Sequence, residues 1–142
     1  MAERWNPWRA LGERRHVEFD LVELPMVAGG GLYWPQEGWA AILVDRSLPR
    51  RLRRAALAHE LIHDERHGGA GAPGMPSTWR PVVARDERRV DDEVARRLVP
   101  PDELRYLLEC LTGMGLPVET WDVARQFDVP DDVAQRALDL LG

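Results

Sequence analysis

The segment 58–63, with the sequence AHELIH, places His59 and His63 four residues apart on either side of Glu60. Residues 49–67 around it have helical periodicity, and four residues make about one turn, so both imidazoles lie on one face about 6 Å apart. Two imidazole nitrogens at this separation can bind one metal ion, and neutral imidazole suits Zn²⁺. Glu60 can act there as a general base toward a water molecule on the ion. The spacing therefore predicts a catalytic zinc site on a helix.

Chance is a poor explanation for this motif. Four His and twelve Glu among 142 residues give an expectation of about 0.01 random matches in such a chain. The same helix carries apolar residues at spacings of three and four: Leu52, Ala55, Ala56 and Ile62. Because His59 and His63 fall within this stripe, they face the core. The alternative is a pair of core histidines whose nitrogens are satisfied by hydrogen bonds alone.

A catalytic zinc ion usually has three protein ligands, so a third must come from elsewhere in the chain. His67 lies on the same helical face, but eight residues of helix rise roughly 12 Å, too far for it to share an ion with His59. Glu87 falls in register with Val90 on a helix that we expect over residues 86–98, so its carboxylate faces the core. We therefore predict Glu87 as the third ligand, with an exposed helical acid as the alternative.

Other acids surround Glu87 on the same predicted helix. Asp91 lies one turn further along and can accept a hydrogen bond from a ligating histidine, which fixes the orientation of the imidazole. Asp86, Asp92 and Glu93 lie off this face, and we expect solvated charges there. The predicted site thus consists of three ligands, one general base and one orienting carboxylate.

The segments on either side indicate an α+β fold. Before the motif we expect strands at residues 16–24, 32–34 and 39–44, with a hairpin loop at 36–38. Residues 68–81 are rich in Gly and Pro and read as a connector. After it we expect helices over residues 86–98, 102–110, 119–127 and 131–141. This order predicts a single domain over 1–142: strands and the motif helix in 1–67, the connector, and a helical part over 82–142 that supplies the third ligand.

Length and composition limit the class of protein. A chain of 142 residues with 44% hydrophobic and 30% charged residues is typical of one soluble globular domain. The longest apolar run covers residues 39–44, far short of the roughly 20 residues that span a bilayer. The first residues lack the apolar stretch of a secretory leader, and the single Cys110 allows no internal disulfide. We expect a cytoplasmic protein with no membrane partner.

Charge bears on nucleic-acid binding. The last two expected helices have the spacing of a helix-turn-helix, yet residues 117–142 hold six acids and two arginines. A net charge of −4 there would repel phosphate, and the whole chain carries −5. A nucleic-acid partner is therefore disfavoured, and we expect these helices to pack against the rest of the domain.

Together these segments resemble the ImmA/IrrE family of bacterial metallopeptidases over roughly residues 17–105. That family shows a HELxH helix, here ALAHELIHDERH, followed by E-x-x-A-N-x-F-A-x-x-L-L-M-P, here ERRVDDEVARRLVP. Aligned without gaps, Glu87 falls on the family's glutamate, and residues 98–100 fall on its Leu-Met-Pro. The chain departs from the pattern at five positions: Val90, Asp91, Glu93, Val94 and Arg97. The terminal helix pair is similar to the family's helix-turn-helix-like segment in position only.

The resemblance implies a zincin-like fold and a zinc-dependent endopeptidase, with Zn²⁺ held by His59, His63 and Glu87. It further implies that the substrate is a specific helix-turn-helix repressor in a phage, mobile-element or stress-response setting. A non-proteolytic regulator that inactivates a repressor by contact is the alternative, and a DNA-binding helix-turn-helix module is a third. His, His and carboxylate could also hold Mn, Fe or Co.

Several features of the substrate site stay open at this point. An extended substrate can pair with a strand edge near residues 32–34 or 39–44. Candidates for stabilising an oxyanion are Tyr33, Tyr106, His16 and His67, each with a structural role as the stronger interpretation. Residues 32–34 and Trp79 could form an apolar contact surface, although six tryptophans in a small domain are more typical of a core.

Overall fold

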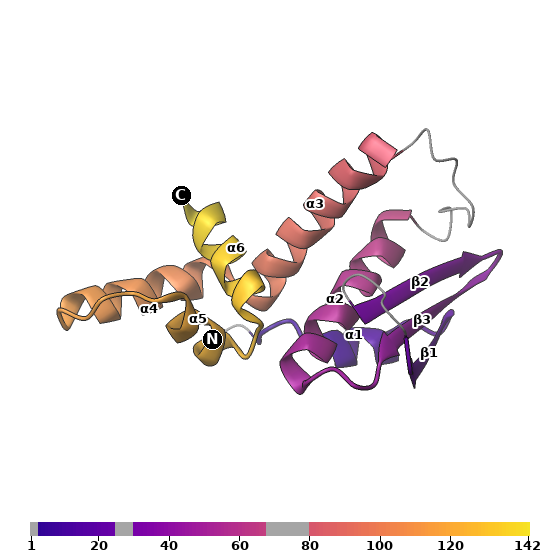
Figure 1. Cartoon of the computed structure of the whole chain (residues 1–142), viewed down its shortest axis with the longest axis horizontal. Helices are drawn as coiled ribbons and strands as arrows, with labels where there is room; N and C mark the ends of the chain where they lie inside the picture. Colours follow the sequence, from indigo (N-terminus) through magenta and orange to yellow (C-terminus); the bar gives the residue numbers. More distant parts are fainter. Residues whose placement is uncertain (1–2, 25–29, 68–79) are drawn as a thin grey trace.

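The computed structural model describes residues 3–24, 30–67 and 80–142, and for residues 67 and 80–85 it describes the backbone alone. Its fold is α+β, with a small sheet followed by a helical part (Figure 1). The elements are α1 (Pro7–Glu13), β1 (Val17–Val22), β2 (Gly31–Gln36), β3 (Trp39–Asp45), α2 (Arg50–His67), α3 (Arg80–Leu98), α4 (Pro101–Gly113), α5 (Thr120–Phe127) and α6 (Asp131–Leu141).

The sheet has the strand order β1-β3-β2, with β1 parallel and β2 antiparallel to β3. The central strand β3 pairs Ile42 with Phe19 on one side and with Tyr33 on the other. Side chains alternate between faces along a strand, so these three point the same way, toward α2. Burial alternates along much of residues 17–22 because one face of this strand is directed at the core.

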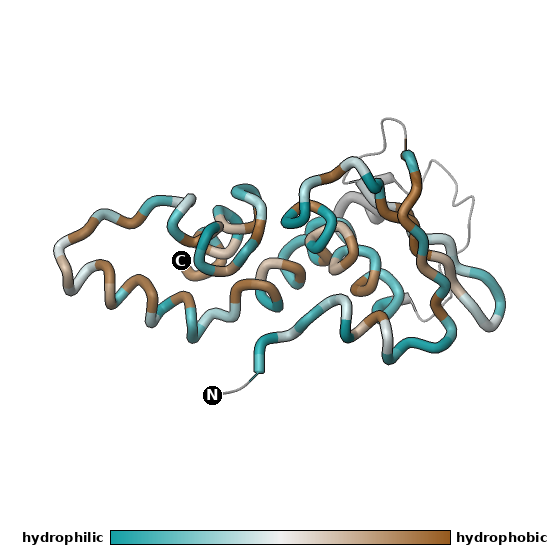
Figure 2. Tube along the Cα trace, turned by 90° about the horizontal axis from the view of Figure 1, so that it is seen from below, coloured by the Kyte–Doolittle hydropathy of each residue, from teal (hydrophilic) through white to brown (hydrophobic). Residues whose placement is uncertain are grey.

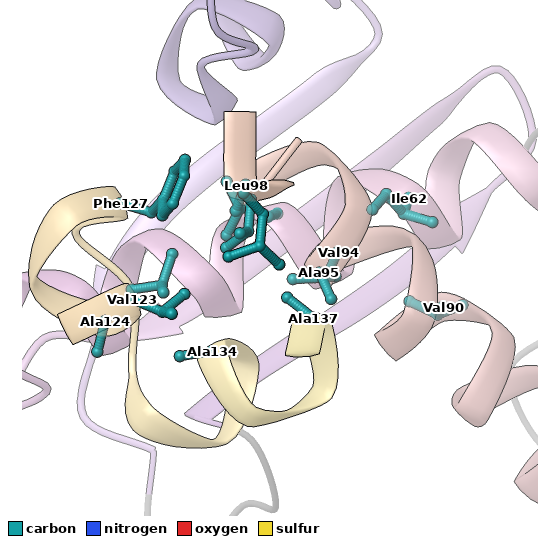
Figure 3. Close-up of a cluster of buried hydrophobic side chains, with 14 residues drawn as sticks. Ile62, Val90, Val94, Ala95, Leu98, Val123, Ala124, Phe127, Ala134 and Ala137 are labelled. Carbon is teal, nitrogen blue, oxygen red and sulfur yellow. The ribbon is translucent and has the colours of Figure 1, made fainter. Parts of the chain in front are cut away.

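The helix α2 lies between the sheet and the helices α3 to α6 (Figure 1). On the sheet side, Ala56, Leu57 and Leu61 pack with β3. On the opposite side, Ala58 and Ile62 belong to a cluster formed with the helices α3 to α6 (Figure 3). Because α2 is covered from two directions, its buried surface is wider than the stripe predicted from the sequence. Leu52, a member of that stripe, is exposed instead.

The terminal helices α5 and α6 pack into the cluster that α2 forms with the helices α3 to α6. This packing was expected, because their net negative charge disfavours contact with nucleic acid. Val123, Phe127 and Ala134 are buried in this cluster. The turn between α5 and α6 contains Asp128 in a left-handed conformation, with φ of 57°. Arg51 of α2 donates to this carboxylate at 3.1 Å, and this ion pair joins the end of the chain to the motif helix.

The helices differ most from the sequence prediction at α1 and at the start of α3, and α4 also extends three residues beyond its predicted end. The helix α1 was not predicted, although Asn6 caps it by accepting from the amides of Trp8 and Arg9 and Pro7 occupies its first position. The helix α3 starts at Arg80, six residues before the predicted start. Pro81 was taken as part of the connector, but a proline is tolerated in the first turn, where its missing N–H has no helical partner. The rest of the connector, 68–79, lies outside the described residues.

The tryptophans do not form the core that their number suggested. Trp8, Trp34, Trp39 and Trp121 are exposed, and the fully buried side chains are mainly Leu, Ile and Val. Trp79 lies outside the described residues. In the described part of the chain, no helix combines the length and the apolar character needed to cross a membrane.

Candidate metal centre

The packing of α2 against α3 brings the predicted site residues together. Ile62 of α2 and Val90 of α3 are buried in one cluster, which sets the two helices side by side. His59 and His63 then face Glu87 across the interface. The two histidines share a face because they are one turn apart. Glu87 joins them because it lies one turn before Asp91 and three residues before Val90, on the side of α3 that packs on α2.

The three predicted ligands form a compact group. Nε2 of His59 lies 2.9 Å from Oε2 of Glu87, and Nε2 of His63 lies 2.6 Å from Oε1 of the same carboxylate. The two Nε2 atoms are 3.1 Å apart. One nitrogen or oxygen atom from each of these residues lies within 4.8 Å of the others.

This donor set fits a zinc ion. Tetrahedral zinc with Zn–N of about 2.0–2.1 Å places neighbouring ligand atoms about 3.3 Å apart, so the three side chains need to separate by less than about 1 Å. Two Nε2 atoms at 3.1 Å can share at most one proton between them, and an ion that accepts both lone pairs satisfies this arrangement better than a hydrogen bond. Two imidazoles and one carboxylate also leave a fourth position free for water or substrate.

Each histidine has a second carboxylate at its other ring nitrogen. Asp91 Oδ1 lies 3.0 Å from Nδ1 of His59, at hydrogen-bond distance. Asp86 Oδ2 lies 4.0 Å from Nδ1 of His63, beyond hydrogen-bond distance, and Oδ1 of the same carboxylate accepts from Arg66 at 2.8 Å. A carboxylate at hydrogen-bond distance, as Asp91 is from His59, fixes the tautomer that leaves Nε2 free for a metal ion.

The three acids expected as solvated charges, Asp86, Asp92 and Glu93, are partly exposed, and each is paired with an arginine. Asp92 accepts from Arg136 at 2.7 Å, and Glu93 accepts from Arg97 at 2.9 Å. Spacing alone did not tell that Asp86 lies near His63. A helix that faces two histidines one turn apart can place one acid near each ring, as it does here with Asp91 and Asp86.

The electrostatics of the group reflect this crowding of acids and imidazoles. Burial lowers the pKa of His59, but hydrogen bonds to Asp91 and Glu87 outweigh it and raise the pKa to about 10. Burial raises the pKa of Glu87, and hydrogen bonds from His59 and His63 outweigh it and hold the pKa far below its usual value. Without an ion, a proton on His59 thus compensates the Glu87 carboxylate, and a bound metal ion would displace that proton.

Glu60 is placed as the predicted general base, beside the ligands and out of bulk water. Only 7% of the residue is exposed, and burial raises the pKa of its carboxyl group while the two neighbouring histidines oppose the shift. Its carboxyl group lies against the backbone of β2. A Cβ atom built on Gly31 would be 3.2 Å from Oε1 of Glu60. A larger residue at position 31 would therefore be in tight contact with the Glu60 side chain.

Substitution of Gly31 by Ala tests this contact. The added methyl group would be tighter against Glu60 than ordinary contacts, so the carboxyl group must shift by a few tenths of an ångström. A misplaced base is costly, and we expect peptide-hydrolysing activity to fall by about tenfold while metal affinity is unchanged. Gly38→Ala is unsuitable as a control because φ is 80° there, so Gly12→Ala, which meets open space, is the matched variant. Equal activity of wild type and Gly31→Ala would contradict the contact.

A buried acid next to His63 links α2 to the strands. Asp64 is fully buried, and its carboxylate accepts from Arg14 at 2.7 Å, from Tyr33 at 2.7 Å and, at 2.8 Å, from Nε2 of His16. The ring of Tyr33 is stacked on that of His63, with centroids 6.3 Å apart. The network therefore holds the last turns of α2, including His63, against α1 and the sheet. Sequence reasoning missed Asp64 because its partners come from two segments far from it in the chain, residues 14–16 and the strand β2.

The Asp64 network predicts a pH-dependent stability. Burial raises the pKa of Asp64, but hydrogen bonds from Tyr33 and His16 and the charge of Arg14 lower it overall. The stabilisation is then present above the unfolded pKa of about 3.9 and is lost as the pH falls toward the folded pKa. We expect Asp64→Asn to lower the free energy of unfolding by about 2 kcal/mol at pH 7 and to flatten its decrease between about pH 4 and pH 2. Urea unfolding at several pH values measures this. Asp20→Asn, at an exposed acid, is the control, and a similar acid limb in Asp64→Asn and wild type would contradict the network.

The candidates for oxyanion stabilisation lose support. The hydroxyl group of Tyr33 donates to Asp64, and Nε2 of His16 is also bound to Asp64. Tyr106 is exposed on α4, on the far side of α3 from the sheet (Figure 1). The side chain of His67 lies outside the described residues.

A cleft of about 640 Å³ opens beside the centre. His59, Glu87 and Asp91 form one wall, Leu48 and Leu52 are part of its apolar lining, and Asp45 and Asp132 also border it. The cleft therefore reaches two of the three ligands, His59 and Glu87, whereas neither His63 nor Glu60 lines it. Exposure of Leu52, which the helical stripe did not predict, is explained by this cleft.

Comparison with models of known protein families, with curated proteins and with solved structures finds no match. Function is therefore inferred from the geometry of the site and from the resemblance of its motifs to the ImmA/IrrE pattern.

Proposed function

We propose that this chain is a zinc-dependent endopeptidase with a zincin-like fold, related to the ImmA/IrrE family. The observation that carries the proposal is the convergence of His59, His63 and Glu87 within 4.8 Å, with the buried Glu60 on the same helix. Two imidazoles, a carboxylate and an adjacent general base match the requirements of metal-assisted peptide hydrolysis. The cleft beside His59 supplies room for a peptide.

The residues divide the work as follows. His59, His63 and Glu87 would hold the ion, and Asp91, at hydrogen-bond distance from Nδ1 of His59, would orient that imidazole. A zinc ion, when bound, lowers the pKa of water and polarises a carbonyl group. Glu60 takes the proton from the attacking water and passes it to the leaving amine, so the proton stays on one carboxyl group between the two steps. Burial of Glu60 keeps this carboxyl group from losing its proton to bulk water.

An extended substrate segment would pair with the outer edge of β2, on which no other strand of the described residues lies. The strand β3 is central, so the alternative edge at residues 39–44 is excluded. Of the two outer strands, β2 is the one whose Gly31 touches Glu60. Main-chain hydrogen bonds along such an edge hold a peptide in register with the site. By the family resemblance, the substrate is a specific helix-turn-helix repressor in the cytoplasm rather than bulk protein.

Cleavage of candidate repressors tests the proposal. The zinc-loaded chain is incubated with purified helix-turn-helix repressors encoded beside its gene, and fragments are identified by mass spectrometry. We expect one defined cut that a zinc chelator abolishes and added zinc restores. A repressor that is bound and released from its operator without being cut would instead support the non-proteolytic regulator.

A further inference from the structure

The face of the sheet that points away from α2 carries an apolar stripe. By register, Leu32 of β2 is opposite Leu43 of β3, and Trp34 is opposite Ala41. Trp39 lies two residues from Ala41 on β3 and is therefore a diagonal neighbour of Trp34 on the same face. Leu32, Trp34 and Trp39 are 42%, 53% and 42% exposed. Two strands thus present a continuous row of large apolar side chains to solvent.

This stripe is separate from the core. The helices α1 and α2 pack on the opposite face, where Ile42 and Val44 are fully buried. In Figure 2 the strands form one margin of the described part of the chain, with helices on one side of them. Exposed apolar patches of this kind on an otherwise polar surface mark sites of interaction.

Acids of β1 flank the stripe on the same face. Glu18 is opposite Ala41 and Asp20 is opposite Leu43 in the parallel register. Both acids are exposed, and neither forms an ion pair with another described residue. The stripe is therefore bordered by two acids with which no described cation pairs.

We propose that this outer face, the stripe together with Glu18 and Asp20, is the docking surface for a protein partner whose apolar side chains are flanked by lysine or arginine. Charge complementarity selects this occupant, because basic groups beside an apolar cluster would meet the two free acids. An anionic membrane surface would be repelled by them. A second copy would bring two acidic rows into one interface, which like charges disfavour.

This proposal rests on the proposed function and says where its protein substrate docks, since β2 carries the stripe on one face and borders Glu60 through Gly31. A protein docked on this face has its adjoining segment close to the metal centre. Docking and chemistry nevertheless use different side chains, so each can fail without the other.

Binding of designed peptides tests the surface. The probe is a fluorescently labelled 18-residue amphipathic helix with Leu on one face and Lys on the flanks, compared with the same peptide carrying Glu on the flanks. Anisotropy titrations are made with the full chain and with Trp34→Ala. We expect the basic peptide to bind at least about tenfold more tightly than the acidic one, and Trp34→Ala to weaken it by about tenfold. Glu18→Gln with Asp20→Asn should weaken it about threefold and reduce its sensitivity to salt.

Trp121→Ala is the matched control, because Trp121 is 57% exposed on α5, outside this surface. Equal affinity for the two peptides, or equal loss in Trp34→Ala and Trp121→Ala, would overturn the proposal. So would a dimer in sedimentation that Trp34→Ala dissociates, since a second copy would then be the occupant. Peptide binding by a chain that cleaves no protein would refute the proposed function and leave the docking surface standing. Repressor cleavage without peptide binding would refute the docking surface and leave the proposed function standing.

Discussion

Glu60→Gln is expected to reduce the rate of repressor cleavage by at least about 10³-fold, since general acid–base catalysis by a positioned side chain contributes about 10² to 10⁴. The amide has nearly the shape of the carboxylate, so the packing against Gly31 is preserved. It cannot accept the proton of the attacking water. Because Glu60 is not among the three ligands, zinc content should be unchanged. Cleavage is followed by gel electrophoresis, and zinc by elemental mass spectrometry on the same sample.

The matched control for this variant is Glu65→Gln, which changes an acid one turn and one residue further along α2. Glu65 pairs with Arg14 and Arg97, outside the ligand group. We expect near-normal cleavage in this control. Full activity of Glu60→Gln would remove Glu60 from the chemistry, and loss of zinc along with activity would show that the substitution acts on the metal site instead.

Glu87→Ala is expected to weaken zinc binding by at least about 10²-fold, because the site then keeps two of its three ligands. The same substitution removes the partner of both Nε2 atoms. Competition with a chromophoric chelator measures the affinity. Binding should also weaken as the solution is acidified, since His59 and His63 bind metal only after losing a proton.

Glu93→Ala is the control for this experiment, since Glu93 lies on the same helix and pairs with Arg97. Its zinc affinity should match that of the wild type. Asp91→Asn tests the orienting contact to His59, with an expected loss of about tenfold. Wild-type affinity in Glu87→Ala would exclude this residue as the third ligand.

Local pattern predicts much of the fold. The motif helix was expected over 49–67 and is observed at Arg50–His67, because 18 residues of regular helix leave a clear periodicity. Alternation similarly located β1, and a continuous apolar run located β3. The seven-residue helix α1 is too short to show a period. The central place of β3 depends on pairing between segments far apart in the chain, which single-sequence patterns do not contain.

The candidate site likewise has a part that the sequence predicts and a part that it does not. His59, Glu60 and His63 lie within five residues, so helix geometry alone brings them together. Glu87 follows from its register with Val90, provided that α3 packs on α2, as it does. Asp86 and the partners of Asp64 were not found, because their roles arise only when α1, β2 and α3 come together around α2. The sequence left the exposure of Trp34 open and gave no sign of that of Trp39, because composition does not tell which face of a strand is covered.

The most direct test of the metal centre is the zinc content of the purified wild-type chain, measured by elemental mass spectrometry after zinc is supplied and unbound metal is removed. The geometry of His59, His63 and Glu87 predicts about one zinc ion per chain. A chain that retains no zinc under these conditions would contradict the metal centre, and the endopeptidase proposal with it.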